Sequence, residues 1–479
     1  MKKAMKFFSM AALCIATVAM VGCSKDEEQP AGSGKVVVST TTIGLGSSEA
    51  SKHLDESGTK TFAAGEEIAV VYENTSSTMV KASVTLAAGD ISNGGKTATV
   101  SVAMTEPMAD GAVKFIYPAS MANDDGTVNY DALYNNQDGT MATLSSNFDY
   151  AEYSGTLSGV DLPANPMLTN QLAVLKFTVQ NTANSQDITD SVTKLTIKHG
   201  SDIYSVTPAT SQSTFWVAVK PIATNDGDIA IYAAVGKDLY KKTVSSYGDL
   251  AAGTFNRITV GATQIPGAVS GLFRVNAAGN LVYFSQGNLR YASSEWSFFP
   301  NQYDYYTTYS ADAWDKFGWS TSTTTYGMST SKNNGYYSGS FVDWGANIGS
   351  GWRTLSKEEW EGVINGHTYG LATVEGVHGI ILLPYNTTVA GFNTDHSNWN
   401  NNQPDASEWA TMEAAGALFL PAAGYRNGSN VLDASNRCDY WSSTTSGTNY
   451  AWFARLRDYV LEFMNYDRYV GRCVRLVCE

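Results

Sequence analysis

Arginine and tryptophan are distributed so unevenly along this sequence that one uniform domain is excluded. The first arginine is Arg257, which begins a set of eleven, and ten of the eleven tryptophans follow residue 290, the exception being Trp216. A single fold draws its core and its surface from the whole chain, and 479 residues are more than one compact domain usually contains. The sequence therefore predicts an arginine-free part followed by a part rich in both residues.

The charge balance argues against two classes of partner. Charged residues make up 16% of the chain, and 45 acidic residues against 31 Lys and Arg give a net charge of −14. Nucleic acids and anionic membrane surfaces are bound by clustered cations. We therefore expect no nucleic-acid partner and no direct binding to a lipid surface.

The first residues have the composition of a secretion signal. Three lysines precede the apolar run Phe7 to Met20, which is too short to span a bilayer. The following Gly22-Cys23 resembles the lipobox of bacterial lipoproteins. The resemblance implies a signal peptide over residues 1–22 and a lipid on Cys23; the alternative is an ordinary secretory signal in which this cysteine is incidental.

Residues 23–35 are expected to form an acidic, flexible linker. Within it, Asp26-Glu27-Glu28 resembles the surface-export tag of Bacteroidetes lipoproteins, and the alternative is a plain solvated segment. The resemblance implies an outer-membrane location at the cell surface, with the membrane contacted through the lipid anchor only.

Residues 36–263 have the pattern of short strands separated by turns. Runs such as Val36–Ile43, Leu172–Val179 and Phe215–Val219 are rich in Val, Thr and aromatic residues with partial alternation, which favours half-buried strands. A loop-like segment around residues 121–165 divides them, and no long amphipathic helix is evident. We expect an all-β region made of two sandwich subdomains, 36–165 and 166–263.

This region resembles the fimbrillin-like proteins, which build or anchor pili in Bacteroidetes, in Phe62–Val70, Pro166–Val179 and Leu250–Val260. The resemblance implies two transthyretin-like β-sandwiches and assembly with other pilus subunits by strand exchange. Polymerising members are typically matured by a cut at an arginine, whereas this part of the chain offers only lysines such as Lys52 and Lys60. Whether the chain polymerises, caps or anchors a pilus therefore stays open.

Residues 264–270 have the composition of a linker, and residues 271–479 form the tryptophan-rich part. Ser356 and Glu359 have the spacing of a capping box, which predicts a helix over Lys357–Ile364 with Trp360 facing the core. A second helix is expected over Ser407–Ala415, and strands follow it. The sequence thus predicts an α+β domain here, and a mixed fold for the whole chain.

This domain resembles the C-type-lectin-like domains of the formylglycine-generating-enzyme type in Phe419–Arg426, Tyr440–Thr444 and Gly471–Arg475. The fold carries many functions, so the resemblance predicts a fold and not an activity. Enzymes of this superfamily use a reactive cysteine pair, but Cys473 falls at a structural position of the family. We therefore expect neither enzyme activity nor a cofactor.

Three cysteines follow Cys23, and they are Cys438, Cys473 and Cys478. Cys473 and Cys478 are an odd number of positions apart, so on one strand their side chains would point to opposite faces. We expect a structural disulfide between Cys438 and either Cys473 or Cys478, which an extracytoplasmic location permits.

The tripeptide Gln403-Pro404-Asp405 resembles the galactose-type motif of calcium-dependent lectins. Calcium takes about six to eight oxygen ligands, and the Trp-Asn-Asp sequence that completes the site in those lectins is absent. Gln403 and Asp405 are thus candidate calcium ligands, but they would supply only part of the ligand set. The alternative is a polar turn in which Asp405 caps the helix that begins near Ser407.

The C-terminal strands carry the candidate ligand-binding residues. With a period of two, Trp452, Ala454 and Leu456 point to one face and are expected in the core. The opposite face is expected to be exposed and rich in Arg and Tyr, which dominate binding hot spots; the alternative is a solvated sheet face. The predicted binding residues are Phe453, Arg455, Arg457, Tyr459, Tyr466, Asp467 and Tyr469.

The same segment resembles the variable region of retroelement-diversified C-type-lectin receptors. The sequence thus favours a cell-surface adhesin, in which a fimbrillin-like stalk or pilus-tip module presents a lectin-fold head to an extracellular protein or glycan. The alternatives are a structural pilin or pilus anchor without its own ligand, and a formylglycine-generating-type enzyme. The enzyme is not expected, because no pairing of a nucleophile with a base is evident.

Overall fold

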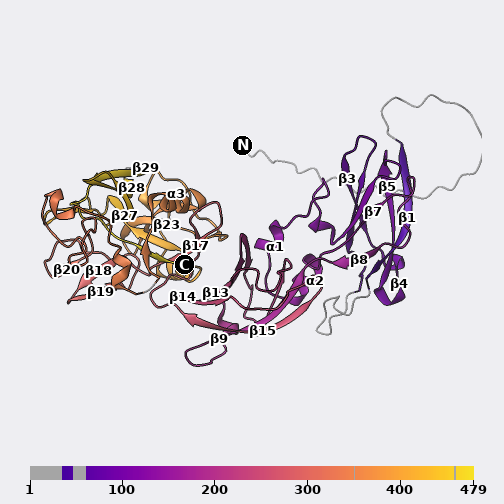
Figure 1. The fold of residues 1–479 in the computed structure, drawn as a ribbon, viewed down its shortest axis with the longest axis horizontal. Coiled ribbons are helices and arrows are strands. Elements are labelled where there is room, and N and C mark those ends of the chain that lie inside the picture. Colours follow the sequence, from indigo (N-terminus) through magenta and orange to yellow (C-terminus); the bar gives the residue numbers. More distant parts are fainter. Residues whose placement is uncertain (1–34, 47–60, 350, 458–459) are drawn as a thin grey trace, which may run out of the picture.

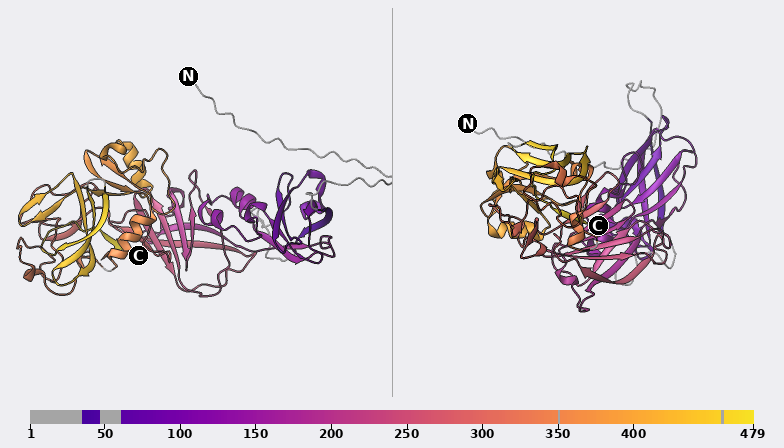
Figure 2. Two further views of the ribbon diagram at one scale, coloured as in Figure 1. Left: turned by 90° about the horizontal axis from the view of Figure 1, so that it is seen from above. Right: turned by 60° about the vertical axis from the view of Figure 1, so that its left-hand side comes forward.

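The computed structural model describes residues 35–46, 61–349, 351–457 and 460–479. Strands dominate, and the described residues form seven sheets. An eight-stranded first sheet, a seven-stranded second sheet and a head of smaller sheets (residues 266–479) follow one another along the longest axis (Figure 1). The left view of Figure 2 shows the same order, with the second sheet between the first sheet and the head.

The first sheet contains β1 (Val36–Leu45), β2 (Glu67–Glu73), β3 (Met79–Thr85), β4 (Ile91–Ser92), β5 (Thr97–Thr105), β6 (Ala112–Tyr117), β7 (Ala151–Thr156) and β8 (Met167–Asn170). Their order is β3-β2-β6-β7-β8-β1-β5-β4. Along β5, Ala98, Val100, Val102 and Met104 are buried and alternate with more exposed residues, as expected for a strand with one face in a core. The predicted strand pattern is confirmed here.

The segment predicted to be loop-like contains two short helices, α1 (Asp131–Asn135) and α2 (Met141–Asn147). Leu133 and Leu144 are buried in the core of the second sheet, so this segment packs against the sheet that follows it. β8 lies beyond the predicted boundary at residue 165, yet it pairs with β1 and β7 of the first sheet. The two β-regions are therefore interlocked in sequence and do not divide cleanly at residues 165 and 166.

The second sheet contains β9 (Ala173–Asn181), β10 (Lys194–His199), β11 (Asp202–Val206), β12 (Phe215–Val219), β13 (Ile229–Val235), β14 (Asp238–Val244) and β15 (Phe255–Gln264). Their order is β11-β10-β13-β14-β15-β9-β12. β15 runs parallel to β9 over eight residue pairs and antiparallel to β14 near Gln264. β15 therefore carries the chain from the second sheet to the head.

The head contains five small sheets. One has the order β16-β17-β30-β21 and the others are β19-β18-β20, β22-β23-β24, β25-β26 and β27-β28-β29. The strands are β16 (Phe273–Arg274), β17 (Leu281–Phe284), β18 (Leu289–Ala292), β19 (Glu295–Phe298), β20 (Ala313–Trp314), β21 (Arg353–Thr354), β22 (Tyr369–Val374), β23 (Val377–Leu382), β24 (Leu418–Pro421), β25 (Tyr425–Asn427), β26 (Asn430–Leu432), β27 (Arg437–Ser446), β28 (Tyr450–Arg457), β29 (Val460–Asp467) and β30 (Leu476–Cys478).

Both helices predicted for the head are present. α3 (Lys357–Gly366) begins with the predicted capping box, in which Ser356 accepts from Glu359 N and Glu359 accepts from Ser356 N. α4 (Ala406–Ala414) ends before Gly416, whose φ of 88° suits the residue that follows a helix. Two helices and several small sheets therefore coexist in this part of the chain.

Tryptophan is concentrated in the head because its sheets are small. Sheets of two to four strands cover little surface, and large rings fill the space between them. Trp319, Trp344, Trp360 and Trp441 are fully buried. The compositional boundary in the sequence therefore marks a change in how the core is built.

The head contacts the second sheet through an apolar junction. Ile203 and Leu239 of the second sheet pack with Leu272, Leu281 and Tyr283 of the head. Residues 268–270, inside the predicted linker 264–270, are buried at this junction. The connection is thus part of a packed interface rather than a free tether.

None of the helices in the described part of the chain has the length and apolar character that crossing a membrane requires.

Candidate ligand-binding surface

The face of β28 predicted to be exposed is covered. Phe453 is 0% exposed and Arg455 is 6% exposed, so the prediction that they bind a ligand directly is wrong. β28 is the central strand of its sheet, and its other face, with Ala454 and Leu456, packs against the core beside α3. The chain around Arg472 covers the Phe453 face, because the Arg472 guanidinium carbon stacks 3.6 Å from the Phe453 ring centroid.

A buried carboxylate neutralises this covered face. Asp439 on β27 accepts two hydrogen bonds from Arg437, at 2.8 and 2.7 Å, and one each from Arg455 (3.2 Å) and Arg472 (3.1 Å). Burial raises the pKa of Asp439, but the hydrogen bond from Arg437 and the three positive charges outweigh it and hold that pKa below its ordinary value. The arginines that the sequence suggested as a binding face are therefore internal structure.

Arg472 lies between aromatic rings. Its guanidinium carbon is 4.4 Å from the Trp441 centroid and 5.6 Å from that of Tyr466, and burial lowers its pKa to about 9. Its Nη1 and Nη2 have no hydrogen-bond partner in the described structure, so the aromatic rings take the place of hydrogen-bond acceptors. Arg472 thus links the core to an exposed tyrosine, Tyr466.

The exposed aromatic side chains of this region gather at the end of the sheet where β28 begins and β29 ends. Tyr450 lies opposite Asp467 across the two strands and is 46% exposed, and Tyr466 is 47% exposed. Asp467 accepts a 2.7 Å hydrogen bond from Asn334 Nδ2, which brings the loop of Tyr336, 70% exposed, to the same end. We call the set Tyr336, Tyr450, Tyr466, Asp467 and Tyr469 the tyrosine surface.

Arg468 holds the loops beneath the tyrosine surface. Its guanidinium donates to Tyr337 O (3.2 Å), Gly339 O (3.1 Å) and Gly447 O (2.9 Å), and it stacks 4.3 Å over Trp319. Because Arg468 is buried, these bonds fix the loops without occupying the surface. Arg468 is a positioning residue for the exposed tyrosines.

The hydroxyl of Tyr469 on this surface is a hydrogen-bond donor at neutral pH. Burial and the nearby Asp467 raise the pKa of Tyr469. A protonated phenol offers both a donor and an acceptor beside an apolar ring. The surface can therefore stack against a ligand and hydrogen-bond to it, with the Asp467 carboxylate as a further acceptor.

The structure brings together only some of the predicted residues. Tyr466, Asp467 and Tyr469 belong to the tyrosine surface, whereas Arg457 lies seven positions along β28 from Tyr450, about 23 Å at the usual strand rise. The side chain of Arg457, and the residues Tyr459 and Cys23, lie outside the described structure. Tyr336 and Tyr450 were missed; their signal was a tyrosine that directly follows a run of Asn, Gly, Ser or Thr.

The expected disulfide is not formed. Cys438, Cys473 and Cys478 are free and buried thiols, and Cys438 Sγ donates to Leu420 O at 3.5 Å. Cys473 pairs with Tyr440 in an isolated β-bridge, and Tyr440 lies two positions after Cys438 on β27. Burial raises the pKa of the Cys438 thiol well above its ordinary range and that of Cys473 to about 12. These thiols act as small apolar core groups.

Asp405 is a helix cap. Its Oδ1 accepts from Ser407 N and Glu408 N, both at 2.9 Å, and Glu408 accepts from Asp405 N at 2.9 Å. Gln403 donates to Asn400 O at 3.4 Å. Across the described residues no group of three His, Cys, Asp or Glu is placed to hold a metal. The alternative interpretation of this tripeptide, a polar turn in which Asp405 caps the following helix, is confirmed.

Comparison with known proteins finds no matching family model and no matching curated protein. Among solved structures, a fimbrial assembly protein of Parabacteroides distasonis is 12% identical with a TM-score of 0.27, over 53% of this chain and 96% of that one. A fimbrial protein of Bacteroides ovatus is 9% identical with a TM-score of 0.24, over 93% and 99%. The minor pilin of Streptococcus agalactiae is 10% identical with a TM-score of 0.22, over 48% and 97%. At such TM-scores these likenesses assign no function to this chain.

Proposed function

We propose that this protein is a cell-surface adhesin whose head binds an extracellular protein or glycan through the tyrosine surface. The observation that carries the proposal is the exposure of Tyr336, Tyr450 and Tyr466 beside Asp467, at a sheet end where a buried arginine holds the neighbouring loops. The head lies at the opposite end of the molecule from the first sheet (Figure 1). The two sheets would then serve as a stalk that carries the binding surface away from the cell.

The chemistry of the surface suits recognition of a neutral or cationic partner. Tyrosine supplies a large contact area with few rotatable bonds, so little side-chain entropy is lost on binding. Its ring stacks on the apolar face of a sugar or on a guanidinium, and its hydroxyl completes hydrogen bonds. Asp467, as a carboxylate, disfavours an anionic partner at this end of the head.

The proposal also includes the fold families of the stalk and of the head. We infer a fimbrillin-like stalk and a C-type-lectin-like head, with pilus subunits as further partners. If the C-terminal segment is diversified, as the resemblance to retroelement-diversified receptors implies, variation should fall on Tyr466, Asp467 and Tyr469. Phe453 and Arg455 should stay constant, because they are buried against Arg472 and Asp439.

Attachment to the outer membrane through Cys23 is the second part of the proposal. Cys23→Ala should release the protein from the membrane fraction, because the lipid would be its only anchor. Metabolic labelling with a radioactive fatty acid, followed by fractionation, measures this, with Cys438→Ala as the control. Retention of unlabelled Cys23→Ala protein in the membrane would overturn lipid anchoring.

The binding surface is tested by replacing three tyrosines together, Tyr450→Ser, Tyr466→Ser and Tyr469→Ser. We expect at least a 30-fold loss of affinity, since the loss of a single hot-spot residue of about 2 kcal/mol already gives that factor, and little change in thermal stability. Protein and glycan arrays find the ligand, and titration of the full chain measures its affinity.

The matched control is Phe255→Ser, which removes an exposed aromatic ring from the second sheet. Ligand capture that survives the triple substitution would refute the tyrosine surface as the site. If no ligand is captured by the wild-type head at all, a structural pilin or anchor becomes the better assignment.

An enzyme remains outside the proposal. A nucleophilic cysteine needs a thiolate, and burial raises the pKa of Cys438 and Cys473. Neither thiol reaches solvent, so neither is placed to react with a substrate.

A further inference from the structure

A cleft of about 700 Å³ opens where the second sheet meets the head. One wall is formed by the start of β10 and by Thr207, and the other by residues 386–388 and the outer side of α4. The volume falls within the range of small-ligand sites. The cleft is separate from the tyrosine surface, because it shares no residue with it.

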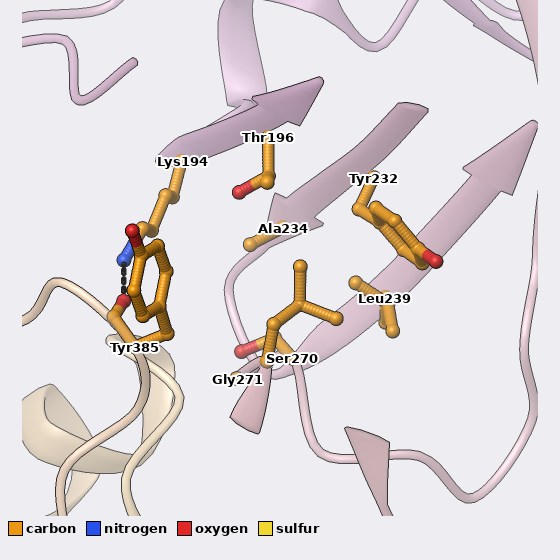
Figure 3. Close-up of a pocket in the computed structure, with 9 residues that line it drawn as sticks. Lys194, Thr196, Tyr232, Ala234, Leu239, Ser270, Gly271 and Tyr385 are labelled. Carbon is orange, nitrogen blue, oxygen red and sulfur yellow. Dashed lines mark hydrogen bonds between the residues drawn. The ribbon is translucent and has the colours of Figure 1, made fainter. Parts of the chain in front are cut away.

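The charged group of the cleft is Lys194. Its Nζ donates to Tyr385 O (2.9 Å), Asn386 O (3.3 Å) and Thr387 Oγ1 (2.8 Å), all of them on the head. Figure 3 shows the Lys194 side chain extending from β10 to the loop of Tyr385. Every one of these acceptors is neutral, and Lys194 takes part in none of the ion pairs in the described structure.

The ammonium of Lys194 therefore lies in a confined place without a counter-charge. Burial lowers its pKa to about 8, which expresses the cost of keeping this charge away from water. No acidic side chain lines the cleft, although the chain as a whole carries a net charge of −14. An anion in the cleft would supply the missing charge.

Neutral polar groups surround the position where such an anion would sit. The hydroxyls of Thr207, Thr388 and Ser407 and the side-chain amide of Asn386 line the cleft, and none of these groups makes a hydrogen bond in the described structure. Ala410 adds a small apolar surface on α4. These side chains are exposed to the open cleft, and their hydroxyl and amide groups match a ligand that itself carries several hydroxyls.

We propose that the cleft between the second sheet and the head binds a carboxylated sugar, with the carboxylate near Lys194 and the ring hydroxyls against Thr207, Thr388 and Ser407. A neutral sugar would leave the ammonium without a counter-charge, and a small inorganic anion would not reach both walls. The ligand would contact the stalk and the head at the same time, so bound sugar would stabilise the junction between them.

The test uses the full chain and trigalacturonic acid, with reduced, uncharged trigalactose as the neutral probe. Titration calorimetry at low salt should show binding of the acidic probe only. Lys194→Met should lower its affinity at least 10-fold, whereas Lys198→Met, on the same strand and bonded to Gly200 O, should leave it unchanged.

A second variant guards against a disturbed junction. Thr388→Val with Ser407→Ala leaves the three bonds of Lys194 in place and should also weaken binding of the acidic probe. In ¹⁵N spectra of the lysine ammonium groups, the titration midpoint of Lys194 should move to higher pH when the acidic probe is bound. Equal affinity for the neutral probe, equal loss in Lys198→Met, or binding of free acetate as tightly as the trisaccharide would each overturn the proposal.

Discussion

Asp439 is the residue whose loss should damage the head most. Asp439→Asn would leave three guanidinium groups in the core with one carboxylate fewer, and breaking a buried pair of this kind costs about 3–5 kcal/mol. The free energy of unfolding in urea measures the effect. Asp433→Asn is the matched control, because Asp433 also pairs with Arg437 but is 51% exposed, and it should cost less than about 1 kcal/mol.

The same carboxylate predicts a dependence on pH. Its folded pKa lies below the ordinary value, so the stabilisation is complete above the unfolded pKa of about 4 and is lost as the pH falls below it. The stability difference between wild type and Asp439→Asn should be constant from neutral pH to about 5 and should shrink in more acidic buffer. A difference that does not change on acidification would show that Asp439 is not ionised in the fold.

At the scale of single residues, the sequence predicts which side chains share a face of a strand better than it predicts what covers that face. Period-two alternation places Ala454 and Leu456 in the core correctly, whereas Trp452, predicted for the same core, is only partly buried. It cannot show that the other face is covered, because that depends on the chain around Arg472, which lies fifteen or more positions away. An isolated guanidinium is rarely buried, but the Asp439 carboxylate pairs with Arg455 and Arg472 and so removes that restriction.

At the scale of elements, helix starts should respond to substitution as their hydrogen bonds predict. Ser356→Ala removes the bond to Glu359 N at the start of α3 and should cost about 1 kcal/mol of stability. Thermal unfolding measures the loss. Ser356→Asn is the matched control, because asparagine also caps helices; an equal loss in both variants would contradict the cap.

The cap on α4 separates two roles for Asp405. Asparagine caps helices as well as aspartate does, so Asp405→Asn should keep the stability within a few tenths of a kcal/mol, whereas Asp405→Ala should lose about 1 kcal/mol. Thermal unfolding should give the same order in excess calcium and in chelator. Calcium-dependent stabilisation that Asp405→Asn abolishes would instead make Asp405 a metal ligand.

Elements with a strong local signal were predictable, and those defined by distant contacts were not. The capping box fixed the start of α3, and the alternation along β5 is clear in the sequence. α1 and α2 have five and seven residues, which is too short for a helical repeat to show. β8 was assigned to the wrong subdomain because its partners, β1 and β7, are set by pairing and not by composition.

At the scale of the whole molecule, Lys194 makes the junction sensitive to alkaline pH. The folded pKa of about 8 lies below the unfolded value of about 10.4, so between them the unfolded chain holds more protons. The stability of wild type relative to Lys194→Met should therefore rise as the pH increases from about 8 to about 10. Denaturant titrations across this range measure the change; a difference that stays constant would contradict the lowered pKa of Lys194.

The tyrosine surface illustrates what a sequence can reveal about a site assembled from the whole molecule. Tyr466, Asp467 and Tyr469 lie within four residues and were found, whereas the loop of Tyr336 joins them through long-range bonds such as the one from Asn334 to Asp467, 133 positions apart. The same holds for the cleft, where Lys194 meets residues more than 190 positions later in the chain. Separations of this length leave no mark in local sequence patterns.

The pairing of β17 with β30 also has a consequence in time. Tyr283 and Cys478 are register partners, so this sheet cannot form until the almost two hundred residues between them have been synthesised and exported. The hairpins of the second sheet need far shorter stretches of chain, as the pairing of Val235 with Asp238 shows. We therefore expect the second sheet to fold before the head. During biogenesis each molecule would pass through a state in which the stalk is folded and the head is not.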